Sequence, residues 1–129
     1  MFALGLFQQQ RLIQNEWSES LTAQARLIAV NSQAAVSFSD QAEARRLLAS
    51  LASNVSILRA RLVTQNGQIF AEYQSSKRDP MLVVVPYTPG LVHIDNGVMT
   101  VWAPIPGFEG DDARVELTAS LEVMRAALL

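Results

Sequence analysis

Residues 8–38 contain no proline and no glycine, and their hydrophobic side chains recur at intervals of three, four and seven positions. This period predicts one long α-helix. No charged residue occurs from Leu27 to Ser39, where Ala, Ser, Gln and Asn predominate. Because burying an unpaired charge is costly, the lack of charge predicts a helix end covered on most sides. We expect the covering elements to be a sheet and either a neighbouring helix or a second subunit.

A second helix is expected over residues 41–52, with a Leu-rich face. Asp40 stands where an N-cap belongs, and Glu43 follows three residues later in an arrangement like a capping box. After this helix the hydrophobic period changes to two, which predicts strands. Asn-Gly pairs, at 66–67 and 96–97, predict hairpin turns. The expected strands cover residues 57–64, 68–75, 91–95, 98–105 and 113–120, with a further possible strand at 81–85.

These elements predict an α+β fold, a two-layer domain with a long N-terminal helix and a second helix packed on a five-stranded antiparallel sheet. A short C-terminal helix is expected to end the chain. In the first strand, Leu58, Ala60 and Leu62 should face the helices, whereas Arg59 and Arg61 should face the other side.

Composition excludes several classes of function. The chain of 129 residues has the length of one domain, and its net charge of −2 argues against a nucleic-acid surface. It has no cysteine and a single histidine, His93, so neither a thiolate metal site nor a Ser-His-Asp triad is predicted. We therefore expect no catalytic residues, metal or cofactor. The apolar ends, 1–7 and 121–129, are expected either to pack on the core or to be membrane-proximal stubs of a longer protein.

Several motifs in this order resemble a known family. Asn31, Ala34, Ala35, Phe38 and Asp40 end the uncharged helix. A Leu-rich helix and a hairpin that closes in Phe-Ala-x-Tyr follow, and the sequence Ala-Pro-Ile lies near the end. Over residues 10–128 the chain resembles the CHASE-type, PAS-like periplasmic sensor domain of membrane-bound bacterial signalling proteins. It is most similar to the subclass found in GGDEF diguanylate cyclases. It departs from that family at Asp111-Asp112-Ala113, where an Ile/Leu-Gly pair is usual, and over 76–97.

The resemblance implies a periplasmic input domain of a dimeric inner-membrane protein. In that reading the parent protein is a diguanylate cyclase, and a small periplasmic repressor protein controls c-di-GMP synthesis through a rearrangement of helices. Flanking membrane spans are then expected in the full-length protein. The alternative is a small-molecule receptor domain, for an organic acid or an amino acid, of a histidine kinase or chemoreceptor.

Three groups of candidate residues follow from these readings. A homodimer through the N-terminal helix would use Trp17, Leu21, Gln24, Ile28, Asn31 and Ala35. A pocket for a small acidic ligand would use Arg59, Arg61 and Glu72, which could instead form ordinary ion pairs on a solvated sheet face. A patch for a partner protein would use Val83, Val84, Val85, Tyr87 and Trp102, unless these side chains belong to the core.

Overall fold

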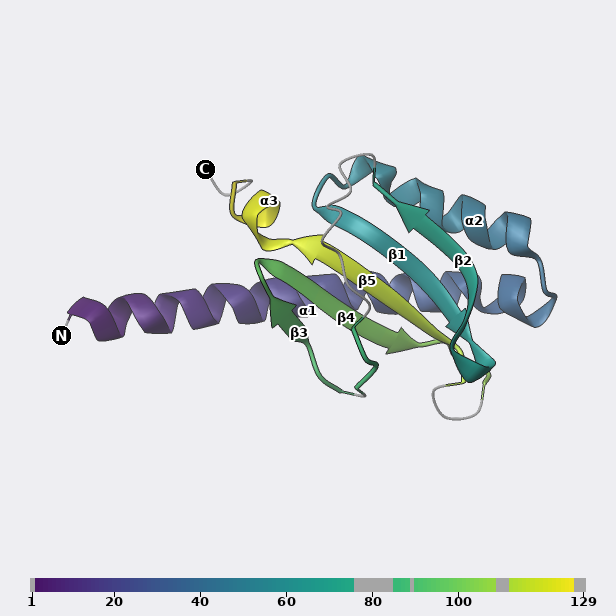
Figure 1. The fold of residues 1–129 in the computed structure, drawn as a ribbon, viewed down its shortest axis with the longest axis horizontal. Coiled ribbons are helices and arrows are strands. Elements are labelled where there is room, and N and C mark those ends of the chain that lie inside the picture. The colour runs from purple at the N-terminus through teal and green to yellow at the C-terminus, as the bar shows by residue number, and fades with distance from the viewer. Residues whose placement is uncertain (1, 76–84, 89, 109–111, 127–129) are drawn as a thin grey trace.

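The computed structural model describes residues 2–75, 85–88, 90–108 and 112–126, with side chains from Gln14 onward except that of Asn66. Three α-helices and five strands make up the described chain, and two short 3-10 turns connect some of them (Figure 1). The helices are α1 (Phe2–Ser37), α2 (Gln41–Ala49) and α3 (Leu121–Ala126), and the 3-10 turns are η1 (Ser50–Ser53) and η2 (Gln65–Gly67). The strands are β1 (Ile57–Thr64), β2 (Gln68–Gln74), β3 (His93–Asp95), β4 (Val98–Pro104) and β5 (Arg114–Ser120).

All five strands join one antiparallel sheet in the order β2-β1-β5-β4-β3. β1 therefore lies between β2 and the last strand, β5. α1 packs on β4 and β5, and α2 packs on β1 and β2, so both helices cover the same face of the sheet (Figure 1). The predicted α+β two-layer fold is confirmed.

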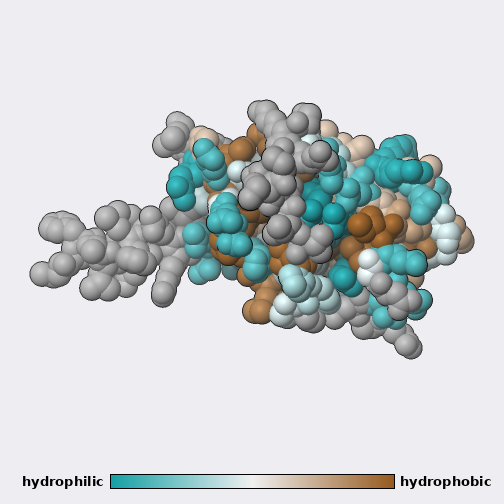
Figure 2. All heavy atoms as spheres, viewed as in Figure 1, coloured by the Kyte–Doolittle hydropathy of each residue, from teal (hydrophilic) through white to brown (hydrophobic). Residues whose placement is uncertain are grey.

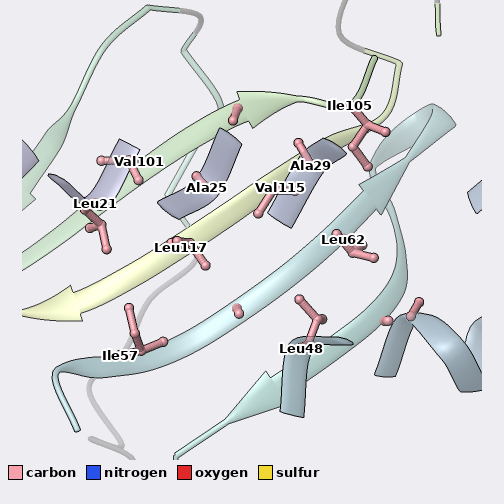
Figure 3. Close-up of a cluster of buried hydrophobic side chains, with 14 of the residues drawn as sticks. Leu21, Ala25, Ala29, Leu48, Ile57, Leu62, Val101, Ile105, Val115 and Leu117 are labelled. Carbon is pink, nitrogen blue, oxygen red and sulfur yellow. The ribbon is translucent and has the colours of Figure 1, made fainter. Parts of the chain in front are cut away.

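The core lies between the helices and this face of the sheet. α1 contributes Leu21, Ala25 and Ala29, and α2 contributes Leu48 (Figure 3). The small alanine side chains let α1 approach the sheet closely, where they meet large aliphatic side chains. The strand residues in the same cluster include Ile57, Leu62, Val101, Val115 and Leu117.

α1 is longer than predicted, because it begins at Phe2 and projects away from the rest of the molecule (Figure 1). Ala, Leu and Phe in the first turns are compatible with a helix, and the single Gly5 does not stop it. Within the described residues, no helix combines the length and the apolar character that a membrane crossing requires.

α1 ends in a tight backbone motif. The Asp40 N–H donates to the carbonyl of Ala35 at 2.7 Å, and Ser39 adopts a φ of 54°. This is the Schellman arrangement, in which the left-handed position is usually glycine. Asp40 then caps α2, as predicted, by accepting the Glu43 N–H at 3.1 Å. Glu43 pairs with Arg46 instead of closing the capping box.

The sheet differs from the prediction in its irregularities. A β-bulge between Ile57 and Arg59 moves Ile57 into the core-facing position, so the placement of Leu58 on that face is wrong. α2 ends at Ala49 and continues as η1, three residues short of the predicted helix end. Of the possible strand at 81–85, residues 81–84 lie outside the described residues, and Val85 belongs to no strand.

Candidate functional site

One surface of α1 faces away from the sheet and is apolar. Leu27, Val30 and Phe38 are 63%, 58% and 83% exposed, and the exposed Ala23 and Ala34 lie on the same side of the helix. Their spacing of three and four residues places all five on one stripe. We call these five residues the outer strip. In the sequence, Arg26 stands between the first two residues of the strip, Ala23 and Leu27. No charged residue interrupts the strip from Leu27 onward.

The predicted helix contact divides between the core and the surface. Leu21 and Ala35 are buried against the sheet within a single chain, so they contribute to the core and present no surface to a second subunit. Trp17 and Ile28 are half-buried and pack at the edge of the core. Asn31 is exposed beside the outer strip.

A groove of about 250 Å³ adjoins the outer strip, between α1 and α2. Ile28 and Leu27 line it from α1, and Leu47 and Leu51 line it from the other side. The remaining predicted residue, Gln24, also lines this groove, and its side-chain oxygen accepts from the Asn54 amide at 3.3 Å. The outer strip and the groove together form a continuous uncharged surface on the helical layer.

The opposite face of the sheet carries the predicted ligand residues, which form ion pairs. Arg59 Nη2 lies 3.5 Å from Glu116 Oε1, and both residues are almost fully buried, at 3% and 5% exposed. Trp102 Nε1 donates to the other Glu116 oxygen at 3.1 Å. Arg59 thus forms an ion pair, which is one of the two expected arrangements, but the expected solvated setting is wrong because the residue is buried. Hydrophobic and hydrophilic side chains are mixed on this face (Figure 2).

Arg61 makes the second pair of this face, with Glu72 on the neighbouring strand β2. Its Nε donates to Glu72 Oε2 at 2.5 Å, and both side chains are partly exposed. Burial lowers the pKa of the Arg59 guanidinium, and the like charge of Arg61 lowers that pKa further. Glu116 and Glu72 act in the opposite direction. Both predicted arginines therefore have a carboxylate of the same chain beside them.

Of the predicted partner patch, Tyr87 and Trp102 come together. Their ring centroids are 5.7 Å apart in an edge-to-face arrangement, and both residues are half-buried. The guanidinium of Arg114 lies 4.3 Å from the centre of the Tyr87 ring, which is a cation–π distance. Val85 is half-buried, whereas Val83 and Val84 lie outside the described residues. These contacts fix the segment around Tyr87 on the sheet face opposite the helices.

Candidate metal ligands do not come together within the described residues. Among the described residues, no three His, Asp or Glu side chains lie close enough to hold a metal ion. His93 is exposed on the edge strand β3, away from the ion pairs of the sheet face. The notable surfaces of the described chain are thus the outer strip with its groove and the arginine–carboxylate face.

The fold is that of a PAS-like α+β domain, with two helices on one face of a sheet. The family model of the CHASE8 periplasmic sensor domain matches residues 13–100, which is more than half of the chain. The protein therefore belongs to the CHASE8 family of periplasmic sensor domains. It is a regulatory domain with a sensory input role, its location is periplasmic, and the domain itself is not catalytic. No curated protein and no solved structure matches the chain.

Proposed function

We propose that this domain is the periplasmic input domain of a dimeric inner-membrane diguanylate cyclase, and that it dimerises through α1. Membership of the CHASE8 family supports the input role. The similarity of the uncharged helix end and the first hairpin to the cyclase-linked subclass supports the choice of output. The outer strip is the observation that supports dimerisation. A charge-free apolar stripe at coiled-coil spacing suits a second helix of the same kind.

The geometry of such a dimer follows from its attachment. If both subunits are anchored in one membrane, their α1 helices run parallel. A parallel twofold pair places each residue opposite its own copy, so Leu27 meets Leu27 and Ala34 meets Ala34. The small Ala34 permits close approach at that level, while Leu27 and Val30 supply apolar area. The groove between α1 and α2 leaves room for the partner's larger side chains.

Signalling then requires two arrangements of this helix pair that differ in their affinity for a partner. In the proposed mechanism a small periplasmic repressor protein favours one arrangement. Its release repacks the α1 helices, and the change passes through the flanking membrane helices to the cyclase. Control by such a coupling is typically worth about 1–3 kcal/mol, or about fivefold and upward in output.

Leu27→Glu tests the proposal in the full-length protein. Leu27 is exposed, so the substitution leaves the fold of one chain intact, but it puts two negative charges together in the helix pair. Cellular c-di-GMP is expected to fall by about fivefold or more. The matched control is Ala42→Glu, which adds the same charge at an exposed position of α2, and Leu47→Glu on the groove side of α2 is a second test variant.

The proposal predicts little effect of Ala42→Glu and an intermediate effect of Leu47→Glu. A Leu27→Glu protein that remains dimeric and keeps its full c-di-GMP output would contradict it.

We place the repressor on the face that carries Tyr87 and Trp102, where an aromatic pair offers a partner two large rings. The predicted patch also includes Val83, Val84 and Val85. The alternative function, a receptor for a small organic acid, would use Arg59, Arg61 and Glu72 instead. The carboxylates already paired with these arginines favour the repressor reading.

The two readings differ in what they bind. A candidate periplasmic protein whose binding is lost in Tyr87→Ala supports the repressor reading. Thermal stabilisation of the domain by an organic acid or an amino acid, if it is lost in Arg61→Ala, supports the receptor reading instead.

A further inference from the structure

A second concave site lies at the end of the domain opposite the start of α1 and opposite α3. Its lining residues come from the last turn of α1 and the turn after it, from the β1–β2 turn and β2, and from Phe108, Asp112 and Ala113. Its volume is about 390 Å³, within the range of sites for small molecules. Val36, Phe70, Phe108 and Ala113 form its apolar lining, and the two phenylalanines also pack against the core.

Three irregularities of the backbone shape this pocket. A β-bulge leaves Phe70 without a pairing partner, because Leu62 pairs with Ala71 and Val63 with Ile69. Bulges re-aim a side chain in this way, often beside functional sites. Ser39 adopts a left-handed φ of 54° at the rim. Gly107, next to Phe108, has a φ of 91° and approaches Gln33 so closely that a Cβ would lie 2.5 Å from its amide nitrogen.

Polar side chains surround the apolar lining and are available to a ligand. Ser39, Gln65, Gln68 and Asp112 all line the pocket. Within the described part of the chain, none of these four side chains makes a hydrogen bond. Two amides and a hydroxyl can each donate and accept, whereas the carboxylate only accepts. The site thus combines two aromatic rings with three neutral hydrogen-bonding groups and one carboxylate.

This chemistry selects among small molecules by charge. Among the described residues that line the pocket there is no Lys or Arg, and Asp112 adds one negative charge, so an anionic ligand would be repelled. Most of the polar groups are neutral, which favours a neutral ligand with several hydroxyl groups over a cation. The aliphatic hydrogens of a sugar ring can lie on the electron-rich faces of Phe70 and Phe108, while the hydroxyls reach the amides.

We propose that this pocket binds a neutral saccharide, through Phe70 and Phe108 below the ring and Gln65, Gln68 and Asp112 at its hydroxyls. A ligand there would join the end of α1 to the sheet through Val36 and Ser39. The site is separate from the outer strip and from the arginine–carboxylate face. Saccharide binding at this pocket therefore does not depend on whether the proposed dimer forms.

Glucose, glucosamine and glucuronate test the proposal, because they share one ring and differ in charge. Each is titrated into the isotopically labelled domain, and amide chemical shifts are followed by NMR. Glucose is expected to shift the amides of residues around Phe108 and Ala113, with a Kd of about 1 mM or tighter. Glucuronate is expected to bind at least about tenfold more weakly, because it meets Asp112 with a like charge.

Gln68→Ala is expected to weaken glucose binding by about fivefold, the effect of one lost neutral hydrogen bond. Gln74→Ala, on the same strand but outside the pocket, is the matched control and should leave the affinity unchanged.

Three outcomes would overturn the proposal. The first is the absence of localised shifts with glucose at about 50 mM. The second is tighter binding of glucosamine than of glucose, which would assign the pocket to amines. The third is an unchanged glucose affinity in Gln68→Ala.

Discussion

Arg59 and Glu116 show how single residues set the character of the sheet face that lies opposite the helices. Both are almost fully buried, and Glu116 also accepts the indole N–H of Trp102. Removing one partner of a buried ion pair leaves the other charge without compensation in a poorly solvated place. Such a pair therefore makes the fold sensitive to either residue, although its net contribution to stability is small.

Glu116→Gln is expected to lower the free energy of unfolding by about 3 kcal/mol, because it leaves Arg59 buried without its carboxylate. Urea unfolding at one fixed protein concentration measures the change. Glu43→Gln is the matched control, since it breaks the solvent-exposed pair with Arg46 and should change the free energy of unfolding far less than Glu116→Gln. Equal losses in the two variants would contradict the buried character of the Arg59–Glu116 pair.

At the scale of elements, the features that the sequence predicts are the periodic ones. The helix–strand order and the Asp40 cap followed from period and turn residues. The orientation of α1 did not follow, because hydrophobic and small residues occur all around its second half. Leu21 and Leu27 are equally apolar, yet one is buried and the other is 63% exposed. Without a polar face, the helical period cannot distinguish the core from a contact surface.

The pocket lined by Phe70 and Phe108 could not be predicted from the sequence for a related reason. Phe70 points there because of a bulge, and Phe108 follows a glycine with positive φ. Both irregularities depend on how the elements pack, and neither changes the alternation of residue types that indicates a strand.

The substitution Ser39→Gly tests the backbone conformation at the end of α1. Ser39 holds a left-handed φ of 54° in the Schellman motif, and this conformation costs a non-glycine residue about 1 kcal/mol or more. The substitution should therefore raise the free energy of unfolding by about 1 kcal/mol. Ser37→Gly, at the last residue of α1, should lower it by about 0.5 kcal/mol. A loss of stability in both variants would show that the strain at Ser39 is not relieved by glycine.

At the scale of the whole molecule, the two sides of α1 have different surroundings. The sheet and α2 bury one side of α1, and the outer strip leaves the opposite side apolar and uncharged. The absence of charge from Leu27 to Ser39 thus has two sources, the core on one side and the proposed subunit contact on the other. A helix in this position would belong to the domain and to the proposed dimer at once, so a change in either could be passed to the other.

The central claim is that α1 pairs in parallel with α1 of a second subunit, and cysteine cross-linking tests it most directly. The chain contains no cysteine, so a single new one reports on one position. In the full-length protein, with cysteines elsewhere replaced, Ala34→Cys is expected to form an intersubunit disulfide under mild oxidation, because a parallel pair brings the two Cβ atoms to about 4 Å. Ala42→Cys, which is also exposed but lies on α2, should remain reduced. A monomeric Ala34→Cys protein, or equal cross-linking at both positions, would contradict the account.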